Sequence, residues 1–160
     1  MTSDQILEDS IFKIGKVISV DGRTVRVGVD ETKNGSHVVY QGELLRNISV
    51  GGYVKIAKGF TEIIGKVEGE YIEEDWEARK KQYGSDRGVI TRTLRISLLG
   101  FFRENSFERG IKELPLIDNE CFLLHNSEFN RIHEFVKYND AAITVGTLAL
   151  EKGQTIAVGV

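Results

Sequence analysis

Residues 11–29, IFKIGKVISVDGRTVRVGV, consist of two strand-like runs on either side of Asp21-Gly22. This dipeptide supplies the positive φ angles that a two-residue hairpin turn requires. In the second run, valines alternate with polar residues at the period of a strand with one buried face: Val25, Val27 and Val29. The same period in the first run places four apolar residues on one face: Phe12, Ile14, Ile18 and Val20. The stretch therefore predicts an antiparallel β-hairpin.

Further strand-like runs follow this hairpin at residues 36–41, 53–58, 62–72, 91–103, 120–124, 142–150 and 155–160. Most breaks between them contain glycine, and the 160-residue chain has 17 glycines but one proline. Glycine at this density suits tight turns, bulges and barrel corners. The spacing is typical of an antiparallel sandwich or a small barrel rather than of βαβ units, which need long helices between strands. We expect a single, mainly β domain over residues 1–160.

Two segments have helical patterns. Asn126-Ser127 opens a short stretch in which three apolar residues share one face: Phe129, Ile132 and Val136. The second segment, from Glu73 to Tyr83, begins with acids and ends with bases, the charge order that complements a helix dipole. We therefore expect one or two short helices beside the sheet.

Composition favours a reducing compartment. The formal net charge of -3 indicates no particular partner. The single cysteine, Cys121, lies in an apolar run, which favours a buried thiol over a reactive or metal-bound one. The first ten residues carry acids where a signal peptide carries positive charge, and no apolar run reaches the roughly 18 residues of a membrane span. We expect a cytoplasmic protein with no membrane partner.

Sequence patterns of catalysis and cofactor binding are not found. No glycine-rich turn ends in Lys-Ser/Thr, as phosphate binding by a P-loop requires. The histidines and the cysteine form no pair at metal-ligand spacing: His37, His125, His133 and Cys121. The carboxylates between residues 68 and 77 crowd a strand end and a helix start, where a solvated face explains them better than acid/base chemistry. We predict no catalytic, cofactor-binding or metal-binding residue.

Nucleic-acid binding is the main alternative that the residues leave open. Small barrels of the OB type bind single strands by combining a basic groove with aromatic stacking platforms. Between residues 79 and 95, with Tyr83 among them, basic residues outnumber the single acid Asp86: Arg79, Lys80, Lys81, Arg87, Arg92 and Arg95. The acidic run just before this segment cancels much of its field. In this alternative, a free-standing barrel contacts a single strand through four of these residues: Arg79, Lys80, Lys81 and Arg87.

Residues 142–148, AITVGTL, and 153–158, GQTIAV, are two strand-like runs joined by a short spacer. They resemble the end of the N-terminal barrel, the HAS-barrel, of HerA-type ATPases, which are hexameric DNA translocases of the HerA/FtsK group. In that family an Ile-Gly-x-Leu-like strand precedes a strand that leads into the ATPase core and its Walker A loop. IGKVI at 14–18, GKV at 65–67 and LPLIDNECFLL at 114–124 follow the family's order of elements.

The resemblance implies a small six-stranded, mostly antiparallel β-barrel, closed or partly open, like the N-terminal domains of rotary ATP synthase subunits. It implies that residues 1–160 are the N-terminal part of a longer chain whose RecA-like core begins after residue 160. The segment has no Walker A lysine, Walker B acid or arginine finger, so we do not expect it to be an enzyme. The full-length protein is expected to be an ATPase that uses ATP and magnesium.

In such rings the barrel forms a collar that helps subunits to associate and offers a docking surface. The resemblance implies a hexameric homo-oligomer that meets DNA through its ATPase core. It also implies a nuclease or sirtuin-like effector as partner, in DNA end processing or anti-phage defence. Aromatic residues on an otherwise charged helix are typical interface anchors, so Trp76 and Tyr83 are our candidates for the partner interface. The alternative is that both pack the helix onto the barrel.

Overall fold

A computed structural model of the chain describes residues 11–33, 35, 37–40, 43–75, 89–103, 106–124, 128, 129, 132, 142–147 and 155–159. Six strands form its main body: β1 (Lys13–Asp21), β2 (Thr24–Val29), β5 (Tyr53–Lys58), β6 (Thr61–Asp75), β7 (Val89–Arg103) and β9 (Glu120–Leu123). The other described elements are a 3-10 turn and five strands: η1 (Glu31–Lys33), β3 (His37–Tyr40), β4 (Glu43–Arg46), β8 (Ser106–Arg109), β10 (Ala142–Thr147) and β11 (Thr155–Gly159).

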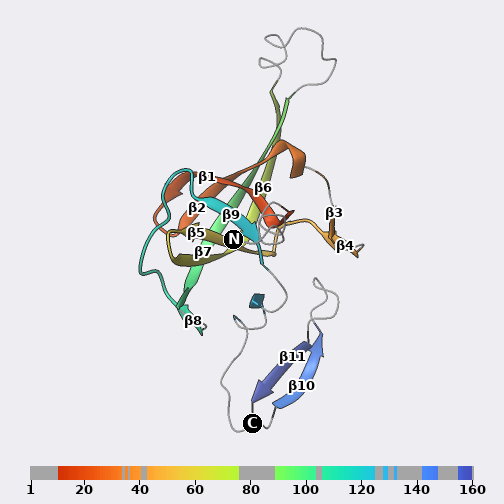
Figure 1. Ribbon diagram of the computed structural model, residues 1–160, viewed down its shortest axis with the longest axis vertical. Coiled ribbons are helices and arrows are strands. Elements are labelled where there is room, and N and C mark those ends of the chain that lie inside the picture. Colours follow the sequence, from red (N-terminus) through yellow and green to blue (C-terminus); the bar gives the residue numbers. More distant parts are fainter. Residues whose placement is uncertain are drawn as a thin grey trace.

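The six main strands close into an antiparallel β-barrel (Figure 1). Their order around the barrel is β2-β1-β9-β5-β6-β7, and an antiparallel pairing of β2 with β7 joins the two ends. β8 pairs with β7 outside the barrel. The closed six-stranded barrel confirms the expected fold class. Closure removes the open sheet edges that would otherwise invite unwanted pairing.

The core is built from the alternating apolar residues of the strands. Val25 and Val27 of β2 are fully buried, and Val29 packs against the same cluster at partial exposure. Three β7 residues at the same period are also fully buried: Leu94, Ile96 and Leu98. Further members come from the other strands of the barrel: Ile14, Val17, Val54, Ile56, Ile63, Val67 and Cys121. Each aliphatic side chain of this size contributes about 1.5–3 kcal/mol through its burial.

The first hairpin forms where the sequence predicts it, but two details of the prediction are wrong. Asp21 pairs with Thr24, so the two-residue turn is Gly22-Arg23, and Gly22 has a φ of 55°. Glycine at the first turn position is typical of a type II′ hairpin. Ile18 is 52% exposed and Val17 is buried instead, because the register of β1 with β9 shifts between Lys13 and Gly15. A bulge of this kind changes which face the following residues occupy.

β1 and β6 share the tetrapeptide Ile-Gly-Lys-Val, at residues 14–17 and 64–67. In both strands the isoleucine, the glycine and the valine are buried, and a register shift follows the valine. A Cβ atom on Gly15 would lie 1.9 Å from the carbonyl oxygen of Gly28, and one on Gly65 would lie 2.3 Å from Cγ2 of Ile96. The glycines therefore allow a close approach of neighbouring strands at two corners of the barrel.

The expected helix from Glu73 to Tyr83 is wrong in its first residues. Residues 73–75 belong to β6 and pair with residues 89–91 of β7. β7 pairs with these residues as a strand, so a charge order that suits a helix dipole does not make a helix here. The remaining residues, 76–83, lie outside the described residues. In the other expected helix, three described residues have helical backbone: Glu128, Phe129 and Ile132.

The shorter strands were partly predicted. β3, β10 and β11 lie within expected runs, whereas β4 and β8 were missed. β3 pairs with β4, and β10 pairs with β11. Among the described strands, neither of these hairpins pairs with the barrel sheet.

Candidate functional site

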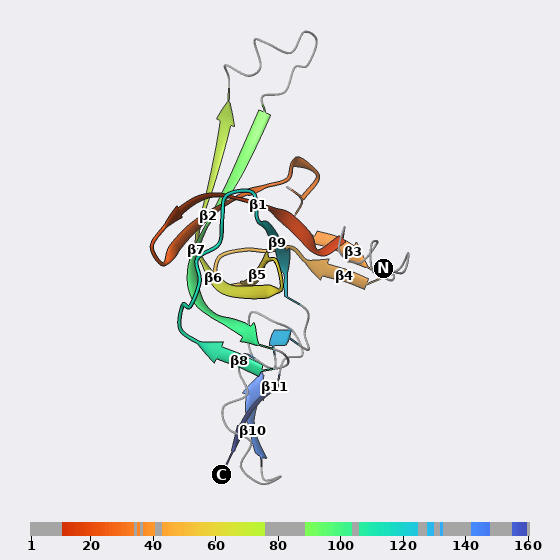
Figure 2. The ribbon, with the colours of Figure 1, turned by 60° about the vertical axis from the view of Figure 1, so that its left-hand side comes forward.

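The main projection of the described structure is a two-stranded arm. β6 pairs with β5 as far as Lys66, and β7 pairs with β2 as far as Thr93. Beyond these points the two strands pair with each other alone and leave the barrel as a ribbon (Figures 1 and 2). We call residues 68–75 and 89–92 the arm.

A bulge sets which side chains the arm presents. The register of β6 with β7 shifts at Glu68, so Glu70, Ile72 and Glu74 lie on the same face as Leu94, Arg92 and Ile90. On β7 this face is continuous with the barrel interior, where Leu94 is fully buried. Beyond the barrel the same face exposes Ile72 by 64% and Ile90 by 51%. Tyr71, on the opposite face, is 46% exposed.

Arg92 anchors the base of the arm. Its side chain is 8% exposed and its guanidinium forms an ion pair with Glu70. Nη2 donates a 2.6 Å hydrogen bond to the carbonyl oxygen of Ile48, and Nη1 donates a 3.3 Å bond to that of Lys33. The planar guanidinium thus joins the arm to η1 and to the connection between β4 and β5.

Asn47 extends this network away from the arm. Its side-chain nitrogen donates to the carbonyl oxygens of Lys33 and Gly35, at 2.6 and 2.5 Å, and its side-chain oxygen accepts from the backbone N–H of Ile48 at 2.8 Å. Asn47 is 5% exposed, and it is satisfied by these bonds. The barrel end beneath the arm is therefore held by two buried polar side chains with several partners each.

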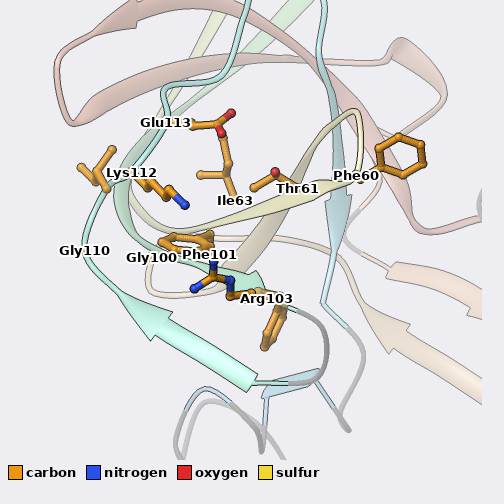
Figure 3. A pocket seen from close by; sticks show the side chains of 11 residues that line it. Phe60, Thr61, Ile63, Gly100, Phe101, Arg103, Gly110, Lys112 and Glu113 are labelled. Atoms are coloured by element: carbon orange, nitrogen blue, oxygen red, sulfur yellow. The ribbon is translucent and has the colours of Figure 1, made fainter.

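A shallow pocket lies at the opposite end of the barrel from the arm (Figure 3). Its volume is about 160 Å³, and its walls come from the β5–β6 turn, the end of β7 and the segment after β8. Ligand sites in proteins more often have about 300–1,000 Å³. Phe60, at the rim, has a fully exposed ring, and Lys112 and Glu113 contribute opposite charges. The pocket is too small and too mixed in charge to indicate a ligand class.

A half-buried ion cluster ties the residues near position 130 to the barrel. Lys55 Nζ lies 2.6 Å from Glu128 and 3.0 Å from Glu62, and its side chain is 17% exposed. Burial, the largest influence, lowers the pKa of Lys55, but the hydrogen bonds and charges of Glu128 and Glu62 together raise it above its ordinary value. Beside the cluster, the rings of Tyr53 and Phe129 meet edge to face at 5.2 Å.

A second exposed apolar surface lies on the loop between β8 and β9. Leu116 and Ile117 are 60% and 56% exposed. The backbone N–H of Asp118 bonds to the carbonyl oxygen of Val17, which places this loop beside Ile18. The loop backbone is thus hydrogen-bonded to β1 of the barrel.

The predicted site residues are not placed by the structure. Six of them lie in the connection 76–88 between β6 and β7, outside the described residues: Trp76, Arg79, Lys80, Lys81, Tyr83 and Arg87. Arg92, which belongs to the basic segment of the nucleic-acid alternative, is buried against Glu70, whereas Arg95 is exposed on the outer face of β7. Sequence reasoning missed the anchoring role of Arg92, although Arg92 and Ile90 continue the period of Leu94, Ile96 and Leu98.

In the described part of the chain, no cluster of histidine, cysteine, aspartate or glutamate side chains is arranged to hold a metal ion. Cys121 is fully buried, as predicted, and burial raises the pKa of its thiol far above the ordinary value. His37 is exposed, and His125 and His133 lie outside the described residues.

No protein-family model matches the chain, and no curated protein matches its sequence. Among the residues that the structure describes, no helix is both long enough and apolar enough to cross a membrane.

Proposed function

We propose that the chain is the N-terminal barrel of a HerA-type ring ATPase and serves subunit assembly and partner docking. The closed six-stranded antiparallel barrel is the architecture that the resemblance implies, and it supports the proposal at the level of the fold. In the full-length protein, ATP and magnesium act in a core that follows residue 160. The protein works in the cytoplasm as a hexameric DNA translocase with a nuclease or sirtuin-like effector.

The observation that carries the docking role is the arm. Ile72 and Ile90 are 64% and 51% exposed on a two-stranded ribbon that extends beyond the barrel. Exposed apolar side chains grouped on a projecting element are typical of protein interaction sites. A ring subunit needs one surface for its neighbour and another for a partner, and the arm and the barrel wall are two such surfaces.

Binding of single-stranded nucleic acid remains the alternative function, and a closed barrel is compatible with it. The electrostatics of the arm favour the docking role instead. Arg92 is neutralised by Glu70, and three exposed acids line β6 beyond the barrel: Glu68, Glu73 and Glu74. Acids at this density repel a phosphate backbone.

The coding sequence downstream of residue 160 tests the proposal most directly. We expect a glycine-rich loop ending in Lys-Ser/Thr within roughly 40 residues, because a P-loop follows the barrel in the family layout. If the downstream sequence contains no such loop, the proposal is wrong.

Oligomeric state gives an independent test. By light scattering at micromolar concentration, we expect residues 1–160 to be monomeric or weakly associated, and the chain with its ATPase core to form a ring. A monomer with the core present contradicts the assembly role. Salt-sensitive binding of an oligonucleotide by residues 1–160, weakened when Arg79, Lys80 and Lys81 are neutralised, supports the alternative.

A further inference from the structure

Within the described residues, the edge of β6 in the arm that faces away from β7 pairs with no strand. The backbone N–H groups of Gly51 and Val67 donate to the carbonyl oxygens of Val67 and Gly52, which ends the pairing on that side. From Glu68 to Glu74, the described structure places β7 on one side of β6 and no strand on the other. An open edge presents N–H and C=O groups in a row that an added strand can bond.

The side chains beside this edge are partly apolar. An added strand alternates its side chains between the two faces of the ribbon. On one face it meets Ile72, with Ile90 diagonally across the ribbon, and on the other it meets Tyr71. Cross-strand contacts with residues of this kind contribute about 0.2–1 kcal/mol each, so apolar residues are favoured in the added strand.

The exposed side chains of the edge residues are mainly acidic, although the guanidinium of Arg95 on β7 lies over Gly69 on the outer face. Glu68, Glu73 and Glu74 are exposed, whereas Arg92, the one basic residue of the described arm, is buried against Glu70. A second copy of this chain that added its own β6 edge would place acids against acids, which is destabilising. A strand with basic residues complements the edge, and the same charge rule disfavours nucleic acid.

We propose that the β6 edge between Glu68 and Glu74 binds, by strand addition, an extended segment of another protein in which basic residues alternate with apolar ones. This inference rests on the docking role proposed above and assigns it a surface and a class of partner. The Arg92 anchor supports it, because an arm held to η1 and to the β4–β5 connection presents its edge in a defined direction. Such pre-organisation lowers the entropic cost of binding.

A synthetic peptide tests the proposal without knowledge of the natural partner. The probe has seven residues, to match the span from Glu68 to Glu74, alternates lysine and valine, and has blocked ends. Titrated into the isotopically labelled 160-residue chain at low salt, it should shift the backbone amide resonances of residues 68–74 and of the paired residues of β7. Added salt should weaken this binding.

Two control peptides separate strand addition from simple charge attraction. A peptide with glutamate in place of lysine should not bind. A lysine–valine peptide with alternate backbone nitrogens methylated retains its charge but loses half of its N–H donors, and should bind at least about tenfold more weakly. Equal binding of the methylated peptide overturns strand addition.

Charge reversal on the arm provides the matched variants. Glu74→Lys should weaken binding of the basic peptide at least about threefold, while Asp21→Lys, an equal charge change at the exposed first hairpin, should leave it unchanged. An equal effect of both variants overturns the site, as does the absence of binding at low salt. The proposal is also overturned if the arm resonances shift with a single-stranded oligonucleotide but not with the peptide. Ring formation by the longer protein is measured without the peptide, so failure of this inference is distinguishable from failure of the proposed function.

Discussion

Arg92 shows how one residue sets the geometry of the arm. Its position in β7 continues the inward-facing period of the barrel, so its guanidinium enters the barrel end instead of solvent. There it contacts partners 22, 44 and 59 residues away in the chain: Glu70, Ile48 and Lys33. A buried charge of this kind is tolerated because several acceptors surround it.

Replacing Arg92 should therefore destabilise the folded chain. Arg92→Met removes the guanidinium donor of Glu70 and of the Ile48 carbonyl oxygen, whereas the Lys33 carbonyl oxygen keeps Asn47 as a donor. We expect a loss of about 2–4 kcal/mol in the free energy of unfolding. Arg95→Met is the matched control, because Arg95 lies on the same strand with an exposed side chain, and it should change stability by less than about 0.5 kcal/mol. Urea unfolding measures both, and equal losses contradict the anchoring role.

Gly15 and Gly65 make a second prediction at the scale of single residues. The nearest atom to a Cβ at Gly15 is a backbone oxygen of Gly28, whereas at Gly65 it is a side-chain methyl of Ile96. A backbone atom moves aside less easily than a side-chain methyl, so Gly15→Ala should lower the free energy of unfolding more than Gly65→Ala. Each substitution should cost about 1–3 kcal/mol or more. Gly146→Ala, which meets no atom within 4 Å, is the control and should be nearly neutral in thermal unfolding.

At the scale of elements, the ion cluster of Lys55 links the barrel wall to residues that follow β9. Glu128 lies 73 residues from Lys55 in the chain, and its carboxylate reaches Lys55 across the outside of the barrel. Ile132 packs nearby against Ile64 and Phe102, so the ionic contact is accompanied by apolar packing. The segment after β9 is thus attached to the barrel by both kinds of contact.

The raised pKa of Lys55 predicts a pH dependence. A group whose pKa is higher in the folded state contributes stability that is complete below its unfolded pKa, near 10.5, and is lost as the pH rises through the folded value. The wild-type chain should therefore lose this contribution to stability as the pH rises above about 10.5, and Lys55→Met should lose less over the same interval.

The same variant should be less stable than the wild type near neutral pH by about 1–3 kcal/mol, because Glu128 and Glu62 lose the partner between them. Lys16→Met, at an exposed lysine of β1, controls for the removal of one positive charge. A Lys16→Met chain with the same change in pH dependence contradicts the role of the cluster. Unfolding by denaturant at each pH provides the measurement.

At the scale of the whole molecule, the fold class could be predicted, whereas the candidate site could not. The valines of β2 and the leucines and isoleucine of β7 alternate clearly enough to locate both strands, and glycine marks the turns between most strands. The arm was missed because the acids of Glu73–Asp75 also suit the start of a helix. Only their pairing with Val89–Thr91 makes these residues a strand.

The sequence by itself determined the mainly β class, the approximate position of most strands and the burial of Cys121. These properties depend on the alternation of neighbouring residues, which is local in the chain. The tertiary structure decided the closure of β2 on β7, the bulge against β9 that leaves Ile18 outward, the bulge in β6 that turns Glu70 inward, and the meeting of Arg92 with Glu70. The physical reason is that register and ion pairing depend on partner strands far away in the chain, and a period of two is compatible with several choices of partner.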